Sequence, residues 1–332
     1  MKTLMIYGAS GYTGQMATEY AKKLELNVIA AGRNTAKLAK LALDLDIPYR
    51  VFSLEDTAVV DKALSDVTAI LNCAGPYYRT AEPLMRASIR TGTHYLDIAA
   101  ELDSYLLAEK LDNEATTAGI LLLPGSGGSV AMLGCLAGYA AETVSKPRKV
   151  SIALHVSGSM SRGSAISANE NMTSVVLQRL NGQLVPQNPD NIQHFDFGKG
   201  FVPCFPVTLP DLITIWRSTQ IPDIETFVYV SGNAFPKGDL TALPDGPSIE
   251  ERDANRYHAA VNIIDDRGFI THAVLDTVNG YTFTPIAAIE AALRILMLET
   301  KNYSGFHTPA ALFGHDFVTT IADTNIFLNH SG

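Results

Sequence analysis

The sequence predicts an α/β protein that begins with a Rossmann-type, doubly wound parallel sheet and continues into a second, mixed α/β domain with a mainly antiparallel sheet. Three observations support this prediction. Short apolar runs alternate with amphipathic helical patterns over about the first 128 residues. A glycine-rich turn follows the first apolar run. Beyond Pro147 the runs lengthen and alternate between apolar and polar residues, which is typical of antiparallel strands with one wetter face.

The first strand and its turn are the element around which the chain is organised. Residues 2–7 form an apolar run, and glycines then follow at G-x-x-G-x-x-G spacing before a helical pattern. Strand, glycine turn and helix in this order predict a dinucleotide site, with helix-start N–H groups facing the phosphates. Gly8 permits the tight turn, Gly11 lets a pyrophosphate approach the backbone, and Gly14 lets the helix pack on the strand. We expect the cofactor to be bound by Gly8, Ser10, Gly11, Tyr12, Thr13 and Gly14. The alternative is a turn that serves packing only.

The first domain continues with five further strands. They are predicted at residues 27–31, 49–52, 69–73, 94–97 and 120–123, separated by helices at 35–45, 59–64, 82–90 and 102–118. Thr35 is expected to cap the first of these helices. Because the strands are apolar throughout, we expect a parallel sheet covered on both faces. The predicted domains are an NADP-binding Rossmann domain at 1–128 and a substrate and dimerisation domain at 129–332, whose C-terminal segment can return to the first domain.

The second domain is predicted to open with a helix that Ser129 caps and that runs to about Glu142. Strands are predicted at residues 150–156, 212–218, 226–231, 259–264 and 269–278, and a helix at 164–180. Segments 186–210 and 233–248 are interpreted as long loops, either lids or surface excursions. Thr284-Pro285 and Thr308-Pro309 carry the cap-then-proline signal of a helix start.

Composition excludes several classes of protein. Hydrophobic residues make up 47% and charged residues 18%, which predicts a large core, and a net charge of -9 argues against a nucleic-acid partner. The uncharged stretch 115–141 is interrupted by residues 124–128, so we expect a strand, a loop and a helix and no membrane span. No signal peptide is expected, because a strand follows Lys2 at once. Three cysteines without C-x-x-C, and histidines without His-x-x-x-His, predict no metal site and a cytoplasmic location.

Ligands of a doubly wound sheet bind beyond the carboxyl ends of its strands. The loop after the fourth predicted strand contains small residues that let a cofactor lie close to the backbone, and we expect contacts from Cys73, Ala74, Gly75, Pro76 and Tyr77. The polar groups expected nearest the nicotinamide are Tyr77, Tyr78, Tyr95, Asp97 and Glu101, and none is assigned as the proton donor. Segment 97–101, after the fifth strand, is a second candidate loop. Segment 125–129, after the sixth strand, is a third, since it lies at a helix start whose N–H groups can hold an anion. A tight turn is the alternative for each loop.

The end of the second predicted strand favours NADP(H) over NAD(H). An NAD site usually has an acid there to hold the ribose 2′-hydroxyl, and such an acid repels a 2′-phosphate. Here the strand ends at Gly32, Arg33 and Asn34, with no acid. We expect the planar guanidinium of Arg33 to bind the 2′-phosphate and Asn34 to add a hydrogen bond.

Segments 8–14, 31–33, 72–77 and 92–101 together resemble the saccharopine dehydrogenase-like family, which includes saccharopine reductases and trans-acting enoyl reductases. Weaker similarity continues at 279–284 and 305–310. The resemblance implies an NADP(H)-binding Rossmann domain followed by a mixed domain that shapes the substrate site and a homodimer. Many relatives carry a Gly-Phe-Asp-like segment after the sixth strand, where this chain has residues 125–130, so the resemblance does not identify the substrate.

Three functions fit these observations. The first is an NADP(H)-dependent oxidoreductase acting on a small molecule; it would lack the Tyr-x-x-x-Lys pair of short-chain reductases. The second is a non-catalytic NADP(H)-binding sensor or partner protein. The third is a thiol-dependent semialdehyde or acyl-phosphate reductase, which needs an activated cysteine with a nearby base. Cys135 lies in a predicted apolar helix, so we expect it to be a buried, inert side chain.

Overall fold

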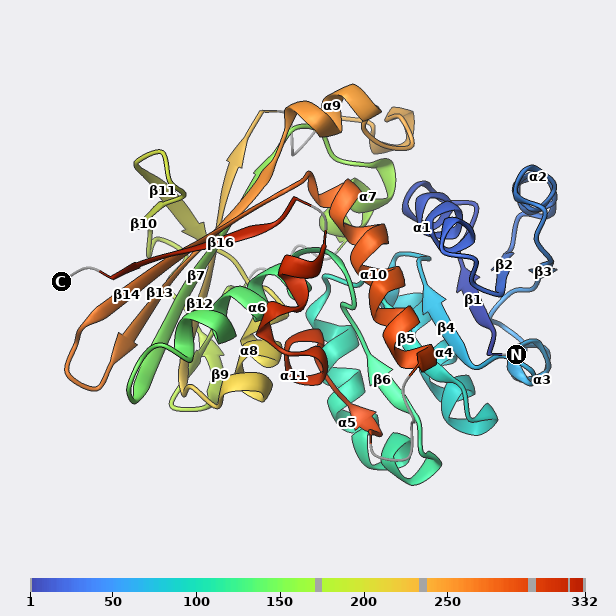
Figure 1. The fold of residues 1–332 in the computed structure, drawn as a ribbon, viewed down its shortest axis with the longest axis horizontal. Helices are drawn as coiled ribbons and strands as arrows, with labels where there is room; N and C mark the ends of the chain where they lie inside the picture. Colours follow the sequence, from blue (N-terminus) through green and yellow to red (C-terminus); the bar gives the residue numbers. More distant parts are fainter. Residues whose placement is uncertain (1, 171–174, 233–237, 298–302, 322, 331–332) are drawn as a thin grey trace. The chain divides into compact units, whose positions relative to one another are not determined.

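The computed structural model describes residues 2–170, 175–232, 238–297, 303–321 and 323–330 (Figure 1). The chain divides into two compact units. Unit 1 comprises Met1–Gly128 with Thr284–His307, and unit 2 comprises Ser129–Phe283 with Thr308–Gly332.

Unit 1 is built on a seven-stranded sheet in the order β15-β6-β5-β4-β1-β2-β3, and all of its strand pairs are parallel. Its strands are β1 (Leu4–Tyr7), β2 (Val28–Gly32), β3 (Tyr49–Val51), β4 (Ala69–Asn72), β5 (His94–Asp97), β6 (Leu121–Leu123) and β15 (Gly305–Phe306). Strands β1, β2, β4, β5 and β6 are buried along their whole length, as expected for a sheet covered on both faces.

The helices of unit 1 are α1 (Tyr12–Lys23), α2 (Thr35–Leu45), α3 (Thr57–Leu64), α4 (Tyr77–Thr91) and α5 (Leu102–Ala118). Helices α3, α4 and α5 pack in a row, and α1 packs against α2. Helix α10 (Gly280–Met297) crosses the boundary between the units, and in unit 1 its Glu290 accepts a hydrogen bond from the Tyr20 hydroxyl of α1 at 3.0 Å. The predicted doubly wound parallel sheet is therefore confirmed.

Two predictions in unit 1 were wrong at helix starts. Helix α4 begins at Tyr77, not at residue 82, because Pro76 occupies the extended N-cap position and Tyr77 and Ala81 are buried on one face. Thr35 does not cap α2. The cap is Asn34, whose side chain accepts a hydrogen bond from the Lys37 N–H at 3.0 Å.

Unit 2 contains a nine-stranded sheet with the main order β10-β11-β12-β7-β13-β14-β16, while β8 pairs with β12 and β9. Its strands are β7 (Pro147–Ser157), β8 (Leu177–Leu180), β9 (Gln183–Pro186), β10 (Gln193–Asp196), β11 (Phe201–Pro206), β12 (Asp223–Ser231), β13 (Tyr257–Asp265), β14 (Ile270–Thr277) and β16 (Asn325–His330). Strands β7 and β12 pair in parallel, and the other described pairs are antiparallel. The predicted mixed, mainly antiparallel second sheet is confirmed.

The helices of unit 2 are α6 (Gly128–Ala141), which starts at the last residue of unit 1, α7 (Arg162–Glu170), α8 (Asp211–Thr219), α9 (Ile249–Ala254) and α11 (Pro309–Phe313). Two 3-10 helices are η1 (Leu240–Ala242) and η3 (His315–Thr320). Thr308 caps α11 through a hydrogen bond from the Ala311 N–H at 3.2 Å, so this predicted helix start is confirmed.

Two strand and loop predictions in unit 2 were wrong. Segment 212–218 is helix α8, not a strand; its β-branched residues suggested a strand, but Pro210 and Asp211 start a helix whose residues 211–215 are buried. Segment 186–210 contains the hairpin of β10 and β11, whose turn depends on positive φ values at Gly198 and Gly200.

Two further helices were predicted with the wrong ends. The helix predicted at 164–180 ends at Glu170, and residues 177–180 form β8; residues 171–174 lie outside the described part. Helix α10 begins at Gly280, one turn before Thr284, because the Asn279 carbonyl accepts hydrogen bonds from the next turn and Pro285 is tolerated inside the helix.

The predicted loop 233–248 includes residues 233–237, which lie outside the described part, and the short helix η1. Among the described residues, no helix is both long enough and apolar enough to cross a bilayer.

Candidate functional site

The strands of unit 1 end together at one edge of the sheet. Tyr7 at the end of β1 is in register with Ala31 of β2 and with Asn72 of β4, and Asn72 is in register with Asp97 of β5. The turns that follow these four strands therefore emerge side by side, where ligands of such sheets bind.

The glycine turn after β1 is held by backbone contacts that leave no room for side chains at two positions. Gly8 has φ of +82°, and a Cβ there would lie 2.8 Å from the Ala74 nitrogen. A Cβ on Gly14 would lie 2.2 Å from the Gly8 carbonyl oxygen. Gly8 therefore allows the loops after β1 and β4 to touch, and Gly14 allows α1 to approach the strand, as the motif predicts.

Gly11 has a different environment. It is exposed at the N-cap of α1, its φ is -81°, and no side chain caps the helix. A Cβ built on Gly11 would meet only the Gly8 oxygen, at 3.3 Å. Ser10, Tyr12 and Thr13 flank it and are half-buried. The first turn of a helix leaves backbone N–H groups without intrahelical acceptors, so this surface fits a phosphate.

Arg33 follows β2 at the same edge. Its side chain is exposed, and within the described part of the chain it makes no ion pair. Burial raises the pKa of the Tyr7 phenol, and the nearby positive charge of Arg33 opposes that rise. Because the Asn34 oxygen already caps α2, only its amide N–H groups remain to meet a ligand.

The loop after β4 is fixed by the side chain of Asn72. Its Oδ1 accepts from the Ala74 N–H at 3.0 Å, and its Nδ2 donates to Thr80 Oγ1 at 3.0 Å. The Thr80 hydroxyl in turn donates to the Ala74 carbonyl at 2.7 Å. Cys73 donates its N–H to the Tyr7 carbonyl, and Gly75 is exposed and joined to Pro76 by a cis peptide bond. The loop thus presents small residues to solvent beside the glycine turn.

Asp97 is fully buried at the end of β5 and joins two further loops. Its Oδ1 accepts from the Ala99 N–H at 3.0 Å and from the Gly125 N–H at 2.8 Å, and its Oδ2 accepts from the Tyr95 hydroxyl at 2.8 Å. Ser126 donates its hydroxyl to the Asp97 carbonyl at 2.8 Å. Burial raises the pKa of Asp97 to about 6, although these hydrogen bonds oppose the rise.

Tyr95 and Asp97 therefore lie beneath the edge and organise it. Asn72 donates its amide to the Tyr95 hydroxyl at 3.3 Å, which links the loops after β4, β5 and β6 in one buried network. Both carboxylate oxygens of Asp97 are occupied by protein groups. These two residues can position loops, but they do not present a reactive atom to a ligand.

The other predicted polar groups separate into two kinds. Tyr77, at the start of α4, is 7% exposed. Burial raises the pKa of its phenol well above the usual range, and the nearby groups of Cys73, Asp97 and Glu101 raise it further. Glu101 is half-buried at the N-cap of α5. Tyr78 is 45% exposed, and the Arg79 guanidinium lies 5.0 Å from its ring centroid.

Sequence reasoning did not single out three polar members of the site: Asn72, Thr80 and Ser126. The one signal available was an asparagine at the end of an apolar, fully buried strand, where an unpaired amide would be costly. Thr80 and Ser126 gave no such signal, since Thr80 precedes the helix predicted at 82–90 and Ser126 lies in the predicted loop at 125–129.

The cysteines do not support thiol chemistry. Cys135 is fully buried in α6, as expected. Burial and the Asp97 charge raise the pKa of the Cys73 thiol to about 12, so it carries almost no thiolate at neutral pH. The thiol-dependent reductase is therefore not favoured.

A parallel, doubly wound sheet with a glycine turn between β1 and α1 defines a dinucleotide-binding Rossmann domain. Residues 4–123 match the family model described as "Saccharopine dehydrogenase NADP binding domain". Residues 4–123 are thus similar to that family of domains, and the cofactor is NADP(H). The resemblance drawn from the motifs at 8–14, 31–33, 72–77 and 92–101 is confirmed.

Curated relatives match the same region. The chain is 28% identical over 144 residues to the "Saccharopine dehydrogenase-like oxidoreductase" of Bos taurus, covering 37% of this chain and 34% of the relative. It is 29% identical over 106 residues to the "Trans-acting enoyl reductase" of Mycobacterium leprae (strain TN), covering 30% of this chain and 25% of the relative. The matched region thus spans about a third or less of each relative's length.

One solved structure shares the fold of the whole chain. Apo histidine-tagged saccharopine dehydrogenase (L-Glu forming) from Saccharomyces cerevisiae superposes with a TM-score of 0.66 and covers 99% of this chain and 100% of its own. The sequence identity is 13%, so this likeness concerns the fold alone.

Proposed function

We propose that the protein is an NADP(H)-dependent oxidoreductase that acts on a small molecule. The observation that carries this proposal is the matched NADP-binding domain, in which Gly11 leaves room for a pyrophosphate and Arg33 offers an uncommitted charge at the end of β2. In this reading the turn at Gly8–Gly14 binds the pyrophosphate, and Arg33 with Asn34 binds the 2′-phosphate. The loop at Cys73–Tyr77 lies against the nicotinamide half.

The nicotinamide supplies the hydride when it is bound, and the protein supplies binding, orientation and proton transfer. Tyr77 is the residue we propose as the proton donor. Its raised pKa keeps the phenol protonated, and its hydroxyl has no hydrogen-bond partner among the described residues. A protonated hydroxyl beside the strand ends has a proton to donate, and the raised pKa means that the transfer needs negative charge developing on the substrate.

Tyr95 and Asp97 act as positioning residues in this proposal. Their network with Asn72 holds the loops after β4, β5 and β6 at the sheet edge. Glu101 lies close enough to influence the Tyr77 phenol electrostatically, and it would keep the proton on the phenol until transfer.

The test uses NADPH that is deuterated at C4 on one face at a time. Enoyl thioesters with NADPH, and saccharopine with NADP⁺, are suggested by the names of the relative and the solved structure. We expect one of the two reactions to proceed: either the enoyl thioester takes deuterium from a single face of the labelled NADPH, or saccharopine delivers its hydride to a single face of NADP⁺. If the protein binds NADPH tightly but transfers no hydride with any of them, the non-catalytic sensor becomes the better hypothesis.

A homodimer and a cytoplasmic location stay predictions. Phe201 and Phe205 of β11 are 73% and 53% exposed, and apolar side chains at such exposure favour a protein contact. Cys73, Cys135 and Cys204 are all free, as a reducing compartment predicts. Light scattering across a concentration series measures the oligomeric state, and a monomer at every concentration would contradict the first prediction.

A further inference from the structure

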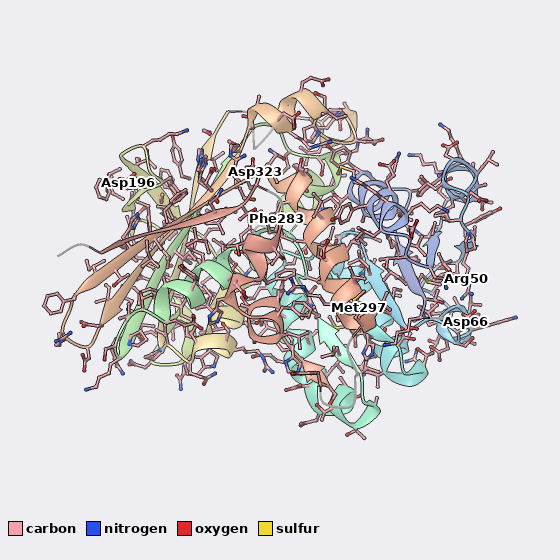
Figure 2. The ribbon with its side chains drawn as sticks, in the orientation of Figure 1. Arg50, Asp66, Asp196, Phe283, Met297 and Asp323 are labelled. Carbon is pink, nitrogen blue, oxygen red and sulfur yellow. The ribbon has the colours of Figure 1, made fainter. Side chains whose placement is uncertain are left out.

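Unit 2 contains a pocket of about 380 Å³ that lies on its sheet, under the hairpin of β10 and β11. The hairpin turn contributes Phe197 and Lys199, and the strands contribute His258, Val274, Asp276 and Phe327. Asp196, labelled in Figure 2, fixes the turn because its Oδ1 accepts from the Gly198 and Gly200 N–H groups at 2.7 and 2.9 Å. The pocket wall is therefore a built loop, and none of its lining residues belongs to the proposed NADP(H) site.

The rings of Phe197, His258 and Phe327 belong to the pocket lining, and His155 and Tyr229 pack behind them. Phe197 is buried and its ring centroid lies 5.6 Å from that of His155. His155 also stacks on His258 at 5.6 Å and packs against Tyr229 at 4.8 Å. Phe327 adds an apolar side chain that is 55% exposed. Such a lining favours a flat, aromatic ligand body.

His258 lines the pocket, and its buried Nδ1 has no hydrogen-bond partner within the described part of the chain. Its Nε2 lies 3.2 Å from Asp276 Oδ1, and the same carboxylate accepts from Arg256 Nε at 3.0 Å and Nη2 at 3.1 Å. Burial lowers the pKa of His258, so the ring is neutral near pH 7 and its proton is assigned to Nε2, facing Asp276. Nδ1 then keeps its lone pair, and it is buried with no hydrogen-bond partner within the described part of the chain. A buried acceptor without a donor is costly, so a ligand donor is favoured there.

Lys199 supplies the charge. It is exposed on the hairpin turn and forms no ion pair within the described residues. Its positive charge lowers the pKa of both His155 and His258, which places it near their rings. The acid in the pocket, Asp276, is already paired with Arg256. The uncompensated charge is therefore positive, and it favours an anionic group on the ligand.

We propose that this pocket binds a small aromatic acid that carries a hydroxyl or amine donor at its other end. The ring would pack on Phe197 and His258, the donor would meet His258 Nδ1, and the acid group would pair with Lys199. The volume lies within the usual range for small-molecule sites. None of the lining residues belongs to the proposed NADP(H) site, so the inference does not depend on the proposed function.

Calorimetry on the full chain tests the ligand chemistry with three probes. 4-Hydroxybenzoate has both groups, 4-methoxybenzoate lacks the donor, and 4-hydroxybenzyl alcohol lacks the charge. We expect 4-hydroxybenzoate to bind about tenfold or more tightly than either analogue. Equal affinities for the three probes, or no binding of any of them at about 10 mM, would overturn the proposal.

Two variants locate the site. We expect Lys199→Gln to weaken 4-hydroxybenzoate binding about tenfold, because the paired cation is lost. His258→Leu should remove the preference for the hydroxyl over the methoxy compound. Lys146→Gln is the control, since Lys146 is a 75% exposed lysine of the same unit that pairs with Asp266. Circular dichroism and a melting temperature like those of the wild type show that each variant is folded; wild-type affinity in Lys199→Gln would contradict the assignment.

Discussion

The Tyr95 hydroxyl donates a 2.8 Å hydrogen bond to Oδ2 of Asp97, and both side chains are completely buried at the end of β5. The same carboxylate receives N–H groups from the segments after β5 and β6. A buried carboxylate therefore ties together loops that border the cofactor site. Its protonation state is consequently linked to the stability of unit 1.

The first prediction concerns that linkage. The folded-state pKa of Asp97 is raised to about 6 from an ordinary 3.8, so the folded state binds more protons than the unfolded state between these values. The stabilising contribution is therefore present below about pH 4 and is lost as the pH rises towards about 6. The loss is about 3 kcal/mol. Urea unfolding followed across this pH range measures it.

Asp97→Asn is the comparison variant for this measurement. An asparagine can still accept the Ala99 and Gly125 N–H groups, but it does not titrate. We expect the variant to lose this component of the pH dependence while other titrating groups behave as in the wild type. The same pH dependence in both proteins would show that Asp97 is not the group responsible.

The second prediction separates binding from folding at the glycine turn. Gly11→Val should abolish NADPH binding and leave the fold largely intact, because φ of -81° suits any residue and the new side chain enters the pyrophosphate space. Gly14→Ala is the matched contrast. Its Cβ would lie 2.2 Å from the Gly8 oxygen, so it should lower the melting temperature. Undiminished NADPH affinity in Gly11→Val, measured by calorimetry, would remove the pyrophosphate assignment.

The third prediction concerns the loop after β4. Gly75 is exposed beside the Asn72 network, and we expect a leucine there to occupy space that the cofactor uses. Gly75→Leu should weaken NADPH binding at least tenfold, which is about 1.4 kcal/mol or more. Hydrogen exchange at residues 73–78 should slow when NADPH binds to the wild type. If exchange there does not respond, the loop has a structural role only.

The fourth prediction concerns proton transfer. Tyr77→Phe keeps the ring and removes the hydroxyl, so we expect kcat to fall about a hundredfold or more with little change in NADPH affinity. Tyr49→Phe is the control, since Tyr49 of β3 is 43% exposed and is not among the residues expected near the nicotinamide. Once a substrate is known, steady-state kinetics on both variants makes the comparison. Equal loss in the two variants, or none in Tyr77→Phe, would contradict the assignment.

The strands and helices of unit 1 were predicted well because the residues that specify them are close together in the sequence. The strand expected at 94–97 and the helix expected at 102–118 match β5 and α5. Fully buried parallel strands read as continuous apolar runs, and the glycine turn has a steric cause that is visible in sequence. The positions of Gly8 and Gly14 against the backbone follow from that same cause.

The parts that were missed depend on long-range contacts. Segment 212–218 is rich in β-branched residues, yet burial and a Pro-Asp start make it a helix. The hairpin of β10 and β11 is set by pairing with β12, which no local pattern reports. Asn72 and Thr80 are joined by a hydrogen bond across a loop that also bonds to the end of β1, so their site role was not visible in local sequence.

The central claim is that this chain selects NADP(H) through the end of β2. Arg33 is exposed there without an ion pair in the described part of the chain, and no acid is present to hold a ribose hydroxyl. A charge-assisted contact of about 1.5–3 kcal/mol corresponds to a preference of roughly tenfold to more than a hundredfold. Lys40→Ala, an exposed lysine farther along α2, serves as the control.

The decisive measurement is a calorimetric titration of NADPH and NADH into the wild type and Arg33→Ala. We predict that the wild type prefers NADPH by at least about tenfold, and that Arg33→Ala loses most of this preference while its NADH affinity stays unchanged. Equal binding of both cofactors by the wild type, or full NADPH preference in Arg33→Ala, would contradict it.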